Sequence, residues 1–126
     1  MSLNPQETYV LLGADGAAAS LPGGEQFWSL PESTLAASGD GWLVSEYLFE
    51  CDWPTWEMHP EADEFVYLLA GEAELLLEHP DGVRTIALSG CGAVIVPRGV
   101  WHTARVMVPS RMLHITRGAG TKTRPV

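Results

Sequence analysis

The stretch from Glu57 to Gly71 reads Glu-Met-His-Pro-Glu-Ala-Asp-Glu-Phe-Val-Tyr-Leu-Leu-Ala-Gly and decides the fold of this chain. Glu57 and His59 are two positions apart, so on a β-strand their side chains would point to the same face. A carboxylate and an imidazole side by side can bind a divalent metal. Glu64 opens the next apolar run, and His102 follows later in the chain. We therefore predict a metal site formed by Glu57, His59, Glu64 and His102.

The order and spacing of these residues resemble the first sequence motif of the cupins, small β-barrels that often carry a metal. That motif usually reads His-x-His, three or four residues, Glu, six residues and Gly. His59, Glu64 and Gly71 reproduce this spacing, whereas Glu57 stands in the place of the first histidine. The added carboxylate oxygen shifts the expected preference toward a divalent ion such as zinc, iron(II), manganese or magnesium.

A second block of residues resembles the second cupin motif, which usually reads Gly, five residues, Pro-x-Gly-x-x-His. Pro97, Gly99 and His102 fit this pattern. The glycine expected before the proline falls on Cys91, and a frequent asparagine after the histidine is Val106 here. The two motifs together imply an all-β, cupin-like double-stranded β-helix (jelly-roll) barrel.

Turn sequences separate short β-prone runs along most of the chain, which is typical of a sandwich or barrel. The length predicts one domain over residues 1–126, with the motif region at about 42–117. We expect N-terminal strands within 8–30 and a loose C-terminal tail at 118–126. The predicted strands are 8–12, 26–30, 42–49, 56–59, 64–69, 73–78, 83–88, 93–96, 101–108 and 111–116, with turns at 70–71, 79–82, 89–92 and 109–110.

Composition favours a folded domain that binds a small molecule. Hydrophobic residues make up 46% of the chain and charged residues 18%, enough apolar side chains for a packed core. The formal net charge of −9 would repel phosphate backbones and anionic membranes, so we expect neither partner. No apolar run is long enough to span a membrane, and the first residues do not resemble a secretory signal. We therefore expect a cytoplasmic protein.

Two cysteines, Cys51 and Cys91, do not form a CxxC pair. In a cytoplasmic protein both are expected as reduced thiols, buried as small hydrophobic side chains. Because Cys91 lies close to the second motif, a redox or ligand role for it stays open.

Five tryptophans are present, and two of them flank the motifs. On a strand, Trp56 and Trp101 would face away from Glu57 and His102, so we expect them in core packing or a subunit interface. An outward apolar face on several strands predicts a homodimer, which the cupin resemblance also implies.

Each candidate ligand also has an ordinary structural interpretation, for example as a hydrogen-bonded or solvated side chain. Chemistry without metal is a further alternative, with Glu57, Glu64 and His102 as acid and base in an apolar pocket. His114 shares a strand face with Met112 and could point inward as a substrate contact or base, or be a packed or surface histidine.

The sequence thus predicts a small metal-binding barrel that binds or converts a small organic molecule. Metal-assisted oxygenation or isomerisation would fit an enzyme. The alternative is a non-catalytic ligand-binding or sensory barrel. Two histidines and two carboxylates around a divalent ion give a neutral complex, whereas the usual three histidines and one carboxylate leave a charge of about +1. Water bound to the ion in the neutral complex should therefore be less acidic than water bound in the complex of three histidines and one carboxylate.

Overall fold

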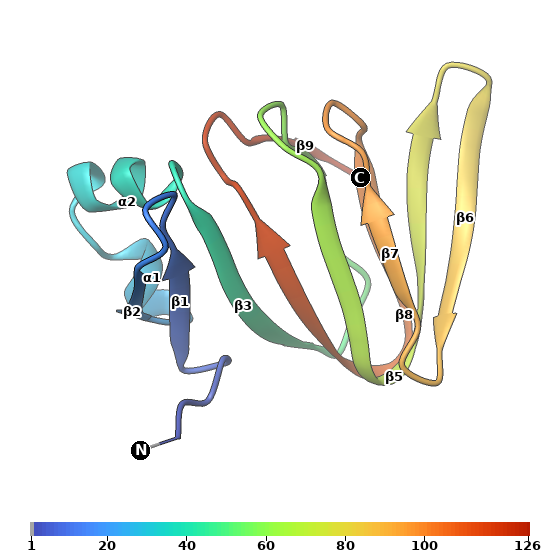
Figure 1. Cartoon of the computed structure of the whole chain (residues 1–126). Helices are drawn as coiled ribbons and strands as arrows, with labels where there is room; N and C mark the ends of the chain where they lie inside the picture. The colour runs from blue at the N-terminus through green and yellow to red at the C-terminus, as the bar shows by residue number, and fades with distance from the viewer. Residues whose placement is uncertain (1) are drawn as a thin grey trace.

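The computed structural model describes residues 2–126, and most of them lie in antiparallel β-strands (Figure 1). The all-β prediction is confirmed. In chain order the elements are β1 (Thr8–Leu12), β2 (Ala18–Pro22), α1 (Glu25–Trp28), α2 (Glu32–Ser38), β3 (Trp42–Phe49), β4 (Thr55–Met58), β5 (Glu64–His79), β6 (Gly82–Ser89), β7 (Ala93–Val96), β8 (His102–Thr116) and β9 (Lys122–Pro125).

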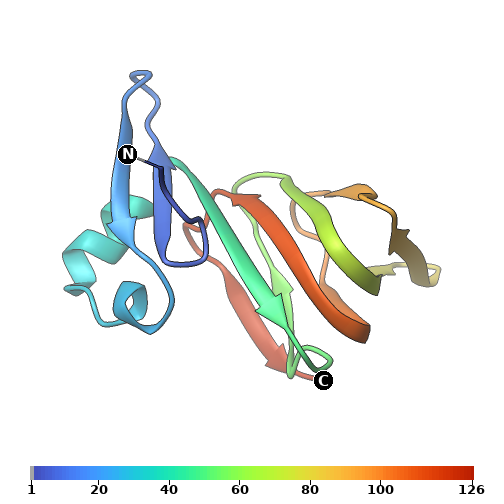
Figure 2. The same ribbon diagram turned by 90° about the horizontal axis from the view of Figure 1, so that it is seen from below.

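Two long strands, β5 and β8, connect the molecule because they pair with each other twice. Residues 65–68 of β5 pair with 112–115 of β8, and residues 72–77 pair with 102–108. The first pairing continues through β3, β1 and β2 on one side and β7 on the other. The second continues through β4 and β9 on one side and β6 on the other. This arrangement of curved strands is that of a jelly roll (Figures 1 and 2).

The turn predicted at Ala70-Gly71 is wrong, because β5 bends there and continues. Gly71 has a φ of 99°, and the register with β8 shifts on both sides of it. A side chain at Gly71 would collide with Ser110, which is fully buried and whose hydroxyl accepts a 3.1 Å hydrogen bond from the N–H of Glu72. Likewise β8 passes through the predicted turn at 109–110 as one strand. Both strands therefore cross from one part of the barrel to the other through a bulge rather than a turn.

The strand predicted at 26–30 is also wrong, because the short helices α1 and α2 occupy this region. Gly24 precedes α1 with a φ of 62°, and Pro31 sits at the N-terminal cap of α2. Phe27 of α1 is buried, and its ring centroid lies 5.4 Å from that of Tyr9 in β1. Burial of one aromatic side chain thus outweighs the weak strand propensity of the segment. Figure 2 shows this N-terminal unit beside the barrel.

The C-terminal tail is ordered, contrary to the prediction, because residues 122–125 form β9 and pair with β4. The guanidinium of Arg124 lies 4.5 Å from the ring centroid of Trp101 and 5.3 Å from that of Trp56. Arg124 also forms an ion pair with Glu78. The two tryptophans that flank the motifs therefore hold the tail in place through cation–π contacts.

The core lies between the strands and is built from their inward side chains. Its fully or almost fully buried members include Val66, Leu68, Leu75, Leu77, Val96 and Met112. Cys51 and Cys91 are free but exposed, so the prediction that they are buried is wrong. Each of them lies in a bend or turn between strands rather than on an inward strand face. Within residues 2–126, neither helix has the length and apolarity needed to cross a bilayer.

Candidate metal centre

The four predicted ligands lie on or directly beside the three strands β4, β5 and β8. Glu57 of β4 pairs directly with His102, the first residue of β8. His59 lies one residue beyond the end of β4, and Glu64 opens β5. Ligand atoms of Glu57, His59 and His102 all lie within 4.8 Å of one another. The carboxylate of Glu64 is 3.2 Å from His102 Nε2 and 3.5 Å from His59 Nε2. The geometry therefore brings together all four residues.

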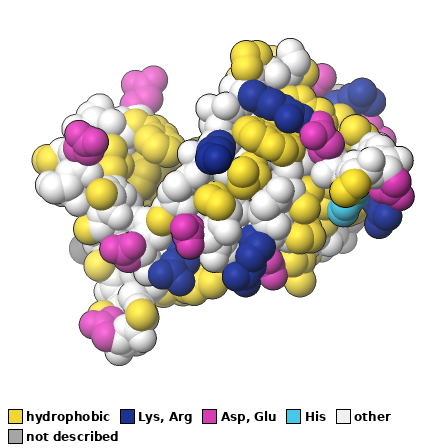
Figure 3. Space-filling view, turned by 90° about the horizontal axis from the view of Figure 1, so that it is seen from above, with side chains coloured by type: hydrophobic (Ala, Val, Ile, Leu, Met, Phe, Trp, Pro, Cys, Tyr) yellow, Lys and Arg dark blue, Asp and Glu magenta, His cyan; other side chains and the backbone are white. Residues whose placement is uncertain are grey.

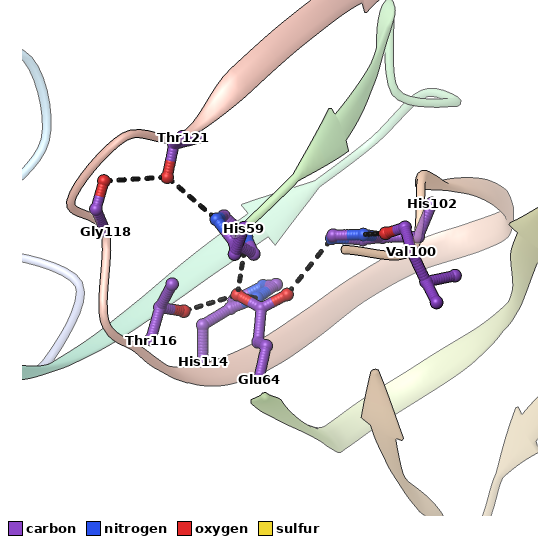
Figure 4. Close-up of polar contacts among 8 residues, drawn as sticks. All are labelled: His59, Glu64, Val100, His102, His114, Thr116, Gly118 and Thr121. Carbon is purple, nitrogen blue, oxygen red and sulfur yellow. Dashed lines mark hydrogen bonds and ion pairs between the residues drawn. The ribbon is translucent and has the colours of Figure 1, made fainter. Parts of the chain in front are cut away.

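Glu64 occupies the middle of this cluster, as Figure 4 shows. Its Oε2 atom lies 3.6 Å from His114 Nδ1, and it accepts a hydrogen bond from the Thr116 hydroxyl. Glu64 and the three histidines around it are all buried. A carboxylate with so little water around it requires positive charge or hydrogen-bond donors nearby.

Hydrogen bonds on the far side of two imidazole rings fix which nitrogen faces Glu64. His102 Nδ1 lies 3.1 Å from the carbonyl oxygen of Val100, which can only accept, so this nitrogen carries a proton. His59 Nδ1 lies 2.8 Å from the Thr121 hydroxyl, which itself donates to the carbonyl of Gly118. The Thr121 oxygen therefore accepts from His59. In the neutral form of both rings, Nε2 is the nitrogen with the free lone pair.

These two lone pairs provide a test of whether a metal fits. His59 Nε2, His102 Nε2 and Glu64 Oε1 are buried, and none of them has a hydrogen-bond partner among the described residues. Lone pairs on two nitrogens and a carboxylate repel one another unless a cation lies between them. An outer hydrogen bond on each ligating histidine is also the usual arrangement in metal sites. The donor set and its orientation therefore fit a divalent ion.

Without a metal, Glu64 and His102 shift each other's protonation. Burial alone would raise the pKa of Glu64, but His102, His114 and His59 hold that pKa well below its ordinary value. Burial alone would lower the pKa of His102, but the neighbouring Glu64 carboxylate raises that pKa above its ordinary value. The Glu64 carboxylate thus favours a proton on His102 when no metal is bound.

Comparison with known proteins gives the fold a name. No protein-family model matches the sequence, and no curated protein matches it. A mutant of oxalate decarboxylase from Bacillus subtilis aligns over 68% of this chain and 24% of its own, with 16% identity and a TM-score of 0.54. Hydroquinone 1,2-dioxygenase from Sphingomonas sp. TTNP3 aligns over 60% of this chain and 59% of its own, with 19% identity and a TM-score of 0.51.

Hydroquinone 1,2-dioxygenase PnpCD, solved in complex with Cd²⁺ and 4-hydroxybenzonitrile, aligns over 60% of this chain and 56% of its own, with 19% identity and a TM-score of 0.51. These enzymes are cupins. The chain has the cupin fold. It spans about a quarter of the decarboxylase chain and somewhat more than half of each dioxygenase chain.

Three residues outside the motifs contact the cluster, namely His114, Thr116 and Thr121. His114 lies in β8 on the same face as Met112 and Thr116, and the alternation along the strand had left an inward position open for it. The structure shows that His114 is buried beside Glu64. Thr121 precedes β9 in the region expected to be loose, so no sequence signal pointed to it.

A large pocket leads from this cluster to the N-terminal helices. Its volume is about 1150 Å³, and its wall includes Glu57, His59, Glu64 and His114 together with residues of α1 and α2. His102 lies behind this wall and is fully buried. Seen from above, the surface is hollowed between the N-terminal unit and the barrel, and hydrophobic side chains face the hollow (Figure 3). A small organic molecule could therefore reach the cluster from this side.

Proposed function

We propose that this protein is a metal-binding cupin that binds or converts a small organic molecule. Glu57, His59, Glu64 and His102 are the proposed ligands of one divalent ion. The observation that carries this proposal is the pair of buried Nε2 lone pairs, fixed by outer hydrogen bonds and directed at the Glu64 carboxylate. Mixed imidazole and carboxylate ligands suit zinc, iron(II) or manganese.

The residues around the ion have separate tasks in this proposal. Thr121 and Val100 hold the two imidazole rings in the orientation that presents Nε2. Thr116 holds the carboxylate of Glu64 by donating a hydrogen bond. When bound, the ion would supply Lewis-acid polarisation of a neighbouring oxygen, weakened by the second carboxylate at Glu57. His114, in the pocket wall, is placed to contact the organic molecule.

Oxygenation or isomerisation is the proposed type of reaction if the protein is an enzyme. Structural neighbours include enzymes named hydroquinone 1,2-dioxygenase and oxalate decarboxylase, and one such decarboxylase structure is described with Mn(II) centres. These names support a metal-dependent reaction on a small organic molecule. They do not select the substrate of this chain, because one barrel hosts many reactions.

Metal analysis tests the proposed site directly. Protein purified without a metal-affinity resin should contain about one divalent ion per chain, since four ligands converge on one point. Glu57→Gln should weaken metal affinity by at least about tenfold because it removes one charged ligand. The matched control is Glu72→Gln, which changes an exposed glutamate outside the pocket. Equal affinity in wild type and Glu57→Gln would remove Glu57 from the site, and absence of metal from both would reject the site.

A non-catalytic ligand-binding or sensory role is the second candidate, favoured by the deep burial of Glu64 and His102. Four protein ligands can close the coordination of a small ion and leave no position for substrate. Turnover that is lost in His102→Ala, with the melting temperature measured alongside, would support an enzyme. Stabilisation by a ligand without turnover would support a binding protein.

We also propose that two copies associate through the outer face of the sheet. Side chains on this face form an apolar row across five paired strands, made by Val10, Val44, Ile115, Phe65 and Ile95. Ile95 is 63% exposed and Phe65 is 38% exposed, so association would remove this surface from water. Sedimentation should show a dimer for wild type and a monomer for Ile95→Asp. A wild-type monomer at high concentration would contradict this proposal.

The remaining expectations concern the surroundings of the protein. The net charge of −9 supports a small-molecule partner over nucleic acid or a membrane surface. Two free cysteines, Cys51 and Cys91, support a reducing compartment such as the cytoplasm.

A further inference from the structure

The pocket wall carries acidic side chains and lacks basic ones. Its acidic members are Glu32, Glu50, Asp52, Glu57 and Glu64. No lysine or arginine lines the pocket among residues 2–126. A carboxylate or phosphate that enters the pocket would lose part of its hydration, which costs free energy. The acidic side chains would also repel it, and no cationic side chain of the wall would compensate.

A bound metal would not reverse this charge, and this step depends on the function proposed above. Glu57 and Glu64 together would cancel the charge of a divalent ion. Glu32, Glu50 and Asp52 would remain, all of them exposed at the pocket wall. The field inside the pocket would thus stay negative in the metal-bound protein.

Aromatic side chains form one part of the apolar wall. The ring centroids of Tyr47 and Phe49 are 5.7 Å apart, and those of Phe49 and Trp53 are 5.2 Å apart. All three rings surround His114, with centroid distances of 5.4, 6.0 and 5.8 Å. Flat rings of this kind favour a ligand with a flat apolar body, since stacking adds to the burial of apolar area.

From these observations we infer that the ligand of this pocket is an uncharged molecule with an aromatic-sized apolar body. Binding of carboxylates and phosphates is weakened by the charge of the wall. The inference names the class of molecule that the proposed function requires.

Two probes of nearly equal shape test this inference, benzyl alcohol and benzoate. Isothermal titration of the protein as purified should show that benzyl alcohol binds at least about tenfold more tightly than benzoate, because only benzoate brings negative charge into the pocket. Equal binding, tighter binding of benzoate, or no binding of either probe would overturn the inference.

A variant with fewer acidic side chains tests whether the charge of the wall causes the preference for benzyl alcohol over benzoate. The double variant Glu32→Gln with Glu50→Gln removes two exposed charges of the wall without touching the proposed ligands. It should narrow the ratio of the two affinities by about threefold per charge. Glu72→Gln, outside the pocket, should leave the ratio unchanged. Equal ratios in the double variant and wild type would overturn the inference.

Elemental analysis of the same samples separates this inference from the proposed function. If metal is absent and benzyl alcohol is still preferred, the metal site is rejected and the ligand class stands. If metal is present and benzoate binds at least as tightly, the metal site stands and the ligand class is rejected.

Discussion

Cys91 is a single residue whose backbone conformation matters. Its φ of 65° lies in the left-handed region, where a side chain is strained by about 1–2 kcal/mol and glycine is not. It is the only non-glycine residue with positive φ in the described chain. Cys91 is exposed, so its side chain contributes little packing. The second cupin motif usually has glycine at this position, and the backbone explains why.

Replacing this residue should stabilise the protein. Cys91→Gly is expected to raise the free energy of unfolding by about 1 kcal/mol, since relief of strain exceeds the extra entropy of glycine in the unfolded chain. Urea denaturation measures the change.

The other cysteine provides the control for this prediction. Cys51 is also exposed but does not have positive φ, so Cys51→Gly should lower stability. A loss of stability in both variants would show that strain at Cys91 is not significant.

At the level of residues, the resemblance to the two motifs was sufficient to select Glu57, His59, Glu64 and His102 as candidates that lie close together in the structure, and their role as ligands stays a prediction. The outer hydrogen bonds could not be found in this way. Thr121 reaches His59 only through the path of the tail, and that path depends on contacts between distant residues.

Among the elements, β9 is the one whose attachment can be tested most directly. Arg124→Ala removes the cation–π contacts with Trp56 and Trp101 and the ion pair with Glu78. We expect a loss of about 1–2 kcal/mol in unfolding free energy, most of it from the aromatic contacts, because half-exposed ion pairs contribute little. Chemical denaturation checks this value.

Lys122→Ala is the matched control, since this exposed residue lies on the same strand. It should change stability by less than about 0.5 kcal/mol. If both variants behave alike, the position of Arg124 between the two tryptophans does not stabilise the tail.

Element boundaries were predictable where local sequence controls them and not where packing does. The β5–β6 turn follows from Pro80 and Gly82, whose backbone preferences are local. By contrast, Gly71 marks a bend inside β5 because Ser110 of another strand lies against it. Similarly, α1 forms where Phe27 can be buried against Tyr9, a contact that no local pattern reveals.

For the whole molecule, the metal-free and metal-bound forms should respond to pH in opposite ways. The pKa of His102 is raised on folding, so its protonated form stabilises the metal-free protein below the ordinary histidine pKa. This stabilisation is lost as pH rises through the folded value. The lowered pKa of Glu64 means that its contribution is lost only as pH falls into strong acid.

Metal binding should strengthen over the same rise in pH, because protons compete for the histidine nitrogens. Because His102 loses its stabilising proton, melting temperatures measured in EDTA should fall as the pH rises above the ordinary histidine pKa of about 6.5. The increase in melting temperature caused by added zinc or manganese should grow over this range. An increase that shrinks with rising pH would contradict ligation by His59 and His102.

The contact between Thr121 and His59 joins residues separated by 62 positions. During synthesis at about 5–20 residues per second, His59 would emerge roughly 3–12 s before its hydroxyl partner. In that interval no Thr121 hydroxyl is available to orient the imidazole. The orientation of the His59 ring is therefore fixed only after Thr121 has been synthesised.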